Sequence, residues 1–180
     1  MRTFLFLLAL LLAAPAGAQQ FDPDSGVPTV IDADVLDYAP GVTILSGQVD
    51  VRQGDVRILA DRMNLYSRDE SVSGGNTPIS DVSRIVAEGN FYYITPEQEV
   101  KGERGVYLAD DDTFTVTGNV LLLQGENVVS GERLIYDLKT DEARVVGTCE
   151  GRKCGGRGRV RILLKQTDQP AGQPQPEGAS

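Results

Sequence analysis

The sequence predicts an all-β protein whose strands form stacked antiparallel repeats. Val, Ile, Leu, Tyr and Thr alternate with polar residues at a period of two, and Gly, Asn or Asp interrupt the alternation at turns. One such pattern occurs three times along the chain. The nearest candidate for a helix, DLKTDEARVV at 137–146, is short and interrupted by polar residues, so a turn followed by a strand fits it better.

The three copies begin at Gly47, Gly89 and Gly118, and read GQVDVRQGDVRILADRMNLY, GNFYYITPEQEVKGERGVYL and GNVLLLQGENVVSGERLIYD. A small residue, an acid and an arginine close the second half of each copy. The arginine always lies fifteen positions after the opening glycine. One unit cannot bury its apolar face alone, whereas stacked units form a continuous apolar surface.

The chain begins with the features of a secretory signal peptide at residues 1–18. Arg2 provides a basic start, FLFLLALLLAA an apolar centre, and Ala16-Gly17-Ala18 a cleavage site, so we expect cleavage after Ala18 and export. A membrane anchor is the alternative. It is disfavoured because the apolar run is shorter than the roughly 20 residues that a spanning helix needs.

The rest of the chain divides into three parts. Residues 19–30 are polar and contain proline, which predicts a mobile lead-in. Residues 31–164 form the predicted β domain, which starts with a half repeat at 31–38, carries an inserted surface loop, SRDESVSGGNTPISD, after the first copy, and ends in a strand at 158–164. Residues 165–180 are rich in Pro, Gln and Gly, which predicts a disordered tail.

Composition excludes several functions. The formal net charge of −9 disfavours nucleic-acid binding, which normally needs a basic surface. Without histidine the chain has no Ser-His-Asp or Cys-His arrangement, and it has no phosphate-binding glycine motif, so we expect no enzyme, no cofactor and no metal site. The cluster Asp110–Asp112 could suggest calcium or acid-base chemistry, but a solvated turn is the better interpretation.

The two cysteines, Cys149 and Cys154, lie close together in TCEGRKCGG. In an oxidising compartment a disulfide that closes this small loop is the favoured interpretation. A redox-active pair is a second interpretation, because neighbouring arginines could lower a thiol pKa. A zinc site is poorly supported, since one cysteine pair cannot provide four ligands.

The alternation assigns an apolar inner face and a mostly polar outer face. The inner face comprises Val49, Val51, Val56, Ile58, Met63, Leu65, Ile85, Ala87, Phe91, Tyr93, Val100, Tyr107, Phe114, Val116, Val120, Leu122, Val129, Leu134, Tyr136, Ala143 and Val145. The repeated acids and arginines are expected on the outside, as a ladder of surface charge pairs. An open stack also leaves unpaired strands at both ends, which can accept a partner by strand addition.

These features leave two functions open. An apolar inner face could hold a lipid, because each buried CH2 group is worth about 0.8 kcal/mol and needs no polar partner. The same alternation could instead form a closed core, which would make the protein a self-stacking scaffold without a lipid ligand.

The string GNVLLLQGENVVSGERLIYD, the matching VAEGNFYYITPEQEVKGERGVYL and the upstream half repeat resemble the OstA-like repeats of the LptA family of periplasmic lipopolysaccharide-transport proteins. The resemblance covers residues 31–147 and extends to the N-terminal domain of LptD. It implies an open, twisted β-jellyroll in the periplasm whose apolar interior shields lipid acyl chains. The paired cysteines and the basic C-terminal segment depart from the family pattern.

The resemblance also implies sites and partners. The lipopolysaccharide groove would be lined by Val49, Val51, Ile58, Leu65, Ile85, Phe91, Tyr93, Phe114, Val116, Val120, Leu122, Val129, Leu134, Tyr136 and Val145. The docking edges would lie at Ile31, Ala33, Val35, Ala143 and Val145. Through these edges the chain would form a head-to-tail homo-oligomer and bridge an LptC-like inner-membrane protein to an LptD-like outer-membrane protein.

Overall fold

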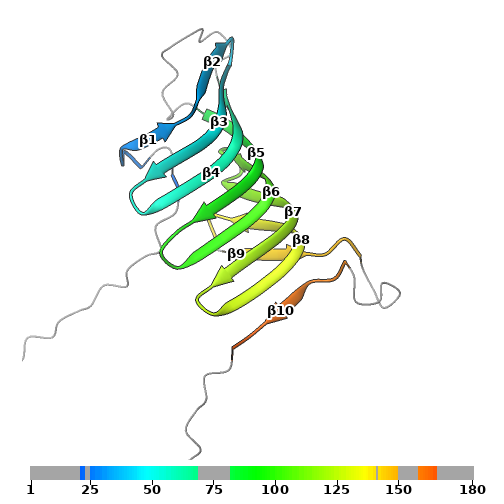
Figure 1. Cartoon of the computed structure of the whole chain (residues 1–180). Coiled ribbons are helices and arrows are strands. Elements are labelled where there is room, and N and C mark those ends of the chain that lie inside the picture. Colours follow the sequence, from blue (N-terminus) through cyan, green and yellow to red (C-terminus); the bar gives the residue numbers. More distant parts are fainter. Residues whose placement is uncertain (1–20, 23–24, 69–81, 141, 150–157, 166–180) are drawn as a thin grey trace, which may run out of the picture.

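The computed structural model describes residues 21–22, 25–68, 82–140, 142–149 and 158–165. Ten strands form one antiparallel sheet with no helix among these residues, which confirms the predicted all-β fold (Figure 1). The strands are β1 (Thr29–Asp32), β2 (Val35–Ala39), β3 (Val42–Gln53), β4 (Val56–Ser67), β5 (Val82–Ile94), β6 (Gln98–Leu108), β7 (Thr113–Gln124), β8 (Asn127–Asp137), β9 (Glu142–Val146) and β10 (Arg161–Leu163).

The central strands β3 to β8 follow one another in the sheet as they do in the chain. Both ends are split. At one end β1 and β2 both pair with β3, and at the other end β9 and β10 both pair with β8. The predicted half repeat at 31–38 is therefore two short strands, and the predicted final strand is β10.

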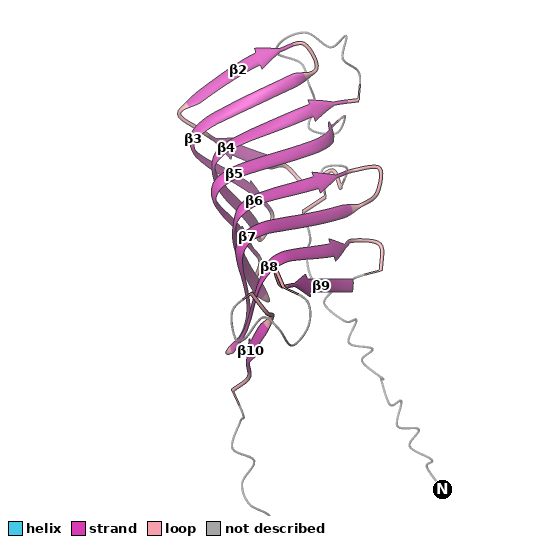
Figure 2. Cartoon of the chain, turned by 90° about the vertical axis from the view of Figure 1, so that its right-hand side faces the viewer, coloured by secondary structure: helices cyan, strands magenta, loops and turns pink. Residues whose placement is uncertain are grey.

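Every long strand bends at one level of the stack. The pairing register shifts at Ser46/Val49, Leu59/Arg62, Glu88/Phe91, Lys101/Arg104 and Thr117/Val120, so the bends line up across the sheet. Bulges of this kind increase local bending and twist. The sheet consequently folds over into two facing parts, an open jellyroll (Figure 2). We call them the β2–β9 half and the β1–β10 half, after the short strands that bound each.

The repeated sequence explains the bend. In β3, β5 and β7 the bend is a glycine followed by Gln or Asn, and both residues have positive φ, as at Gly118 (83°) and Asn119 (48°). In β4, β6 and β8 it is the small residue of the small-acid-Arg motif. A Cβ atom on Gly102 would lie 2.4 Å from Val116 Cγ1, so only a very small residue fits there. The repeat thus encodes the fold line of the sheet.

The core lies between the two halves. Phe114, in the β2–β9 half, packs against Phe91 and Tyr93 of the β1–β10 half, with ring centroids 5.6 and 5.3 Å apart. Such tilted aromatic pairs add to the stabilisation from buried area. The largest fully buried side chains are those of Phe91, Leu134, Val49, Val56, Val116 and Val120. The two halves therefore share one apolar core.

Several sequence predictions concern residues outside the described ranges. They include the signal peptide at 1–18, residues 69–81 of the inserted loop predicted at 67–81, and the tail beyond Lys165. Within the part of the chain that the structure describes, no helix has the length and apolar character to cross a membrane.

Candidate functional site

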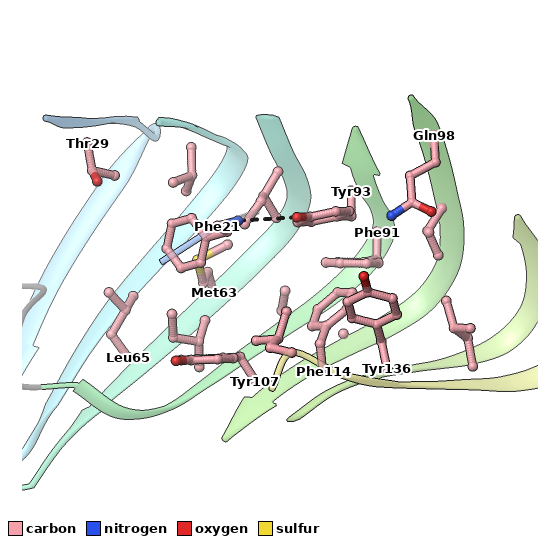
Figure 3. A pocket seen from close by; sticks show the side chains of 18 of the residues that line it. Phe21, Thr29, Met63, Leu65, Phe91, Tyr93, Gln98, Tyr107, Phe114 and Tyr136 are labelled. Carbon is pink, nitrogen blue, oxygen red and sulfur yellow. Dashed lines mark hydrogen bonds between the residues drawn. The ribbon is translucent and has the colours of Figure 1, made fainter. Parts of the chain in front are cut away.

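The interior between the two halves of the sheet is apolar and contains a small open space (Figure 3). Its lining is almost entirely hydrophobic or aromatic, and the few polar groups are neutral: Thr29, Gln98 and the phenols of Tyr93, Tyr107 and Tyr136. No carboxylate or basic side chain lines it. This interior can therefore solvate hydrocarbon.

Most residues predicted to form the groove line this interior. These are Val51, Ile58, Leu65, Ile85, Phe91, Tyr93, Phe114, Leu122, Leu134 and Tyr136. Val49, Val116 and Val120 are completely buried in the core beside it, while Val129 and Val145 pack on the core from its rim. The alternation rule thus found the correct face of each strand, and the structure divides that face into lining and packing positions.

The predicted groove set omits several lining residues, among them Phe21, Thr29, Gln98, Gly105 and Leu138. Gly105 could have been found from the sequence, because the small-acid-Arg bend places the next inward residue three positions after Gly102. Leu138 and Phe21 lie outside regular strands, where alternation gives no information.

Phe21 differs most from expectation, since residues 19–30 were predicted to be a mobile lead-in. Its side chain is only 9% exposed and belongs to the hydrophobic core. Its backbone N–H donates a 3.2 Å hydrogen bond to the Tyr93 hydroxyl of the β1–β10 half. Its ring packs edge-on against Tyr107 of the β2–β9 half, with centroids 6.4 Å apart. Phe21 therefore lies between the two halves of the sheet and contacts both.

A buried glutamine fixes the next residue of this segment. The Gln53 amide oxygen accepts a 2.9 Å hydrogen bond from Asp22 N, and its Nε2 donates to Asp22 O at 2.8 Å and to Thr29 Oγ1 at 3.1 Å. Gln53 is only 5% exposed. The Gln53 side chain hydrogen-bonds both the N–H and the carbonyl oxygen of Asp22, as the backbone of a neighbouring strand would. These bonds hold the adjacent Phe21 in place.

The interior is nearly closed in this state. Its open volume is about 50 Å³, compared with roughly 300–1,000 Å³ for pockets that enclose drug-sized ligands. A second space of about 450 Å³ lies on the outer side of Phe21 and is also lined by Tyr107, Gln53, Asp112, Leu138 and Lys139. Phe21, Tyr107 and Leu138 line both spaces, so they form the wall between them.

Burial in this interior also affects Tyr93. Loss of hydration raises the pKa of its phenol, an effect that the hydrogen bond from Phe21 partly offsets. The phenol therefore stays neutral at physiological pH and adds no charge to the apolar lining.

Charged groups lie on the outer face, but their arrangement corrects one expectation. We expected the repeated acid and arginine to form a ladder of charge pairs. Instead, the acids accept hydrogen bonds from asparagines at the next bend: Asn90 Nδ2 lies 2.9 and 3.2 Å from the two carboxylate oxygens of Asp61, and Asn119 Nδ2 lies 2.7 Å from Glu103 Oε1. Among the repeat arginines, Arg104 does pair with Glu88, at 3.3 Å.

The Asp110–Asp112 cluster occupies a turn, as predicted. Arg68 pairs with Asp110 at 3.2 Å, and Lys139 pairs with Asp112 at 3.3 Å. Among the residues that the structure describes, no three potential ligands come together in a way that could hold a metal ion.

Both ends of the sheet expose apolar side chains. At the first end, the predicted edge residue Ile31 pairs with Val51 and packs on the core. Ala33 lies between β1 and β2, and Val35 in β2 is 50% exposed. At the other end, Ala143 and Val145 lie in β9, opposite Tyr136 and Leu134. The β10 segment, which was not predicted as an edge, exposes Ile162, Leu163 and Leu164.

Cys149 is disulfide-bonded in the structure. Cys154, the predicted partner, lies outside the described residues, so this pairing stays a prediction. Cys149 N donates a 3.0 Å hydrogen bond to Gly158 O, which joins the end of the β9 segment to the start of the β10 segment.

Comparison with known proteins adds two findings. The family model described as "LptA/(LptD N-terminal domain) LPS transport protein" matches residues 31–142. The fold matches the crystal structure of LptH from Pseudomonas aeruginosa, described as the LptA-homologous periplasmic component of the conserved lipopolysaccharide transport device. That match has a TM-score of 0.61 and 18% sequence identity, and covers 81% of this chain and 100% of LptH. No curated protein matches this chain significantly.

Proposed function

Since the chain belongs to the family of the lipopolysaccharide-transport protein LptA and the LptD N-terminal domain, we propose that it carries lipopolysaccharide across the periplasm in its apolar interior. The observation that supports this most is the uncharged lining between the two halves of the sheet. Acyl chains need such a surface, because each buried CH2 group contributes about 0.8 kcal/mol. The phosphates and sugars of the lipid would stay outside, in water.

The exposed ends of the sheet support a bridging role. Apolar side chains of β2 at one end and β10 at the other remain exposed, as at Leu36 (48%) and Leu163 (65%). Edge strands with unsatisfied backbone groups and apolar side chains pair readily with other strands. We propose head-to-tail stacking of copies, with an LptC-like protein at the inner membrane and an LptD-like protein at the outer membrane.

One observation favours a second function. The open interior volume of about 50 Å³ is too small for an acyl chain unless the halves move or a side chain leaves. A protein that remained in this closed state would be a self-stacking β scaffold without a lipid ligand. The two functions differ in one measurable property, which is lipid uptake by the purified protein.

That property can be tested with adjacent residues of β7. Phe114 lines the interior and is partly buried, whereas Thr115 points to the opposite face. The purified mature chain is mixed with lipopolysaccharide, and the bound lipid is measured after gel filtration. Phe114→Asp should lose most of the bound lipid and Thr115→Asp should keep it. A parent protein that elutes without lipid would support the scaffold function instead.

A further inference from the structure

Phe21 occupies the interior position that an apolar ligand would need. It is a buried member of the core, touches both halves of the sheet through Tyr93 and Tyr107, and lines the small interior space (Figure 3). It also lines the larger space on its other side. Phe21, Tyr107 and Leu138 line both spaces, so the Phe21 ring forms part of the wall between them.

Phe21 itself lies outside the repeat. The segment 21–22 precedes the first strand, and the N–H of Phe21, its ring and the hydrogen bonds between Gln53 and Asp22 tie it to the sheet. If the signal peptide is cleaved after Ala18, Phe21 becomes the third residue of the mature chain. Phe21 belongs to none of the ten strands, so its side chain can leave the interior without unfolding any of them.

We propose that Phe21 is an internal plug, which holds the place of a lipid acyl chain in the free protein and is displaced when the lipid enters. This inference rests on the proposed lipid-carrying function and adds to it a named gate and a named entry point. The lipid enters past Tyr107, where Phe21 now separates the interior from the outer space. The Phe21 ring prevents the apolar lining from being exposed to water while no lipid is bound.

The exchange is favourable for a long acyl chain. Roughly two to four buried methylene groups offset the burial of one phenylalanine side chain. An acyl chain with more methylenes than this gains free energy when it displaces the ring, whereas a short chain does not. The plug therefore selects for long acyl chains, and it lowers the apparent affinity for every lipid by the fraction of the protein that is open.

Fluorescence can report the displacement directly, because the chain contains no tryptophan. Phe21→Trp introduces a single indole at the plug position. Val30→Trp is the matched control, since Val30 lies in the neighbouring strand β1, is 54% exposed and lines neither space. In the free protein the Phe21→Trp indole should emit at a shorter wavelength than the control. Added lipopolysaccharide should shift it to longer wavelength and leave the control unchanged.

A second variant tests the energetic cost of the plug. Phe21→Ala should bind lipopolysaccharide on the order of tenfold more tightly than the parent, because no ring has to be expelled. Val30→Ala, at a position that lines neither space, should bind as the parent does. Both affinities are measured by titration with labelled lipopolysaccharide, and circular dichroism confirms that each variant is folded.

The outcomes separate the plug from the carrier function. If the parent binds lipopolysaccharide while the Phe21→Trp emission stays unchanged and Phe21→Ala binds no more tightly, the plug is refuted and the carrier function stands. If neither the parent nor Phe21→Ala binds, both are refuted. A red shift together with tighter binding of Phe21→Ala establishes the plug.

Discussion

Asn119 and Glu103 join adjacent strands at the fold line of the sheet, with Asn119 Nδ2 2.7 Å from Glu103 Oε1. Asn90 and Asp61 make the equivalent contact one unit earlier. The acid of one unit therefore binds the bend of the next, which couples neighbouring repeats at the place where each strand turns. This contact explains why the motif keeps an acid beside its small residue.

The glycine of the bend should be more sensitive than other glycines with positive φ. A Cβ atom on Gly118 would lie 2.6 Å from Glu103 Oε2, whereas one on Gly125 would meet nothing within 4 Å. Left-handed backbone costs an alanine about 1–2 kcal/mol at either position. Gly118→Ala should lower the free energy of unfolding, measured in urea, by at least about 1 kcal/mol more than Gly125→Ala does, because Glu103 must also move. Equal losses would show that the acid contact does not matter.

The first bend can be made more stable by a substitution at Gln48. Gln48 has a φ of 45° where the other bends place asparagine, and Asp34 lies beside Gly47 as Asp61 lies beside Gly89. Asparagine tolerates left-handed backbone better than glutamine does, and its amide could reach Asp34. Gln48→Asn should raise stability by roughly 0.5–1 kcal/mol, measured as an increase in Tm. A lower Tm would contradict this account of the bend.

The outer face should make a pH-dependent contribution through Asp50. Hydrogen bonds from Arg57, at 2.8 and 3.0 Å, hold the pKa of Asp50 below its ordinary value of 3.8. A carboxyl with a lowered folded-state pKa stabilises the fold above its unfolded-state pKa, and this stabilisation disappears as pH falls through the folded-state pKa.

Asp50→Asn should therefore destabilise the protein at pH 7, by about 0.2–1 kcal/mol for a surface pair. The difference from the parent should vanish in acid, below the folded-state pKa of Asp50. Unfolding curves of both proteins across this range measure it. A difference that persisted at the lowest pH would mean that Asp50 acts through packing and not through its charge.

The ends of the sheet predict a specific pattern of association. Lysine on an exposed edge strand blocks pairing with another strand. Leu36→Lys should block the β2 end, and Leu163→Lys should block the β10 end. Each variant alone should sediment as a monomer, whereas an equal mixture should form dimers and nothing longer, because each partner retains one intact end. Longer chains from either variant alone would refute head-to-tail stacking.

Much of this fold could be predicted because the repeat carries its own register. Period-two alternation identified the inward faces of β3 to β8, and the spacing from glycine to arginine identified corresponding positions. The contact between Asn119 and Glu103 could not be read in this way, since it depends on which strands become neighbours. Phe21 could not be predicted because a single aromatic residue in a polar segment has no periodic pattern to mark it.

The volume of the interior also could not be predicted from the sequence. A lipid groove and a closed core need the same alternation, so Leu122 and Phe114 would face inward in either case. Only the packing of side chains from both halves of the sheet, with Phe21 among them, determines how much space remains.

The central claim is that the inner face, and not the outer, meets lipid. Leu122 lines the interior and is 6% exposed, while the adjacent Leu123 points outward from the same strand. A photocrosslinking residue at each position in living cells, followed by blotting for lipopolysaccharide, compares the two faces at one level of the stack. We predict a lipid adduct from position 122 and none from position 123. Adducts to protein alone from position 122, or equal lipid adducts from both positions, would contradict the account.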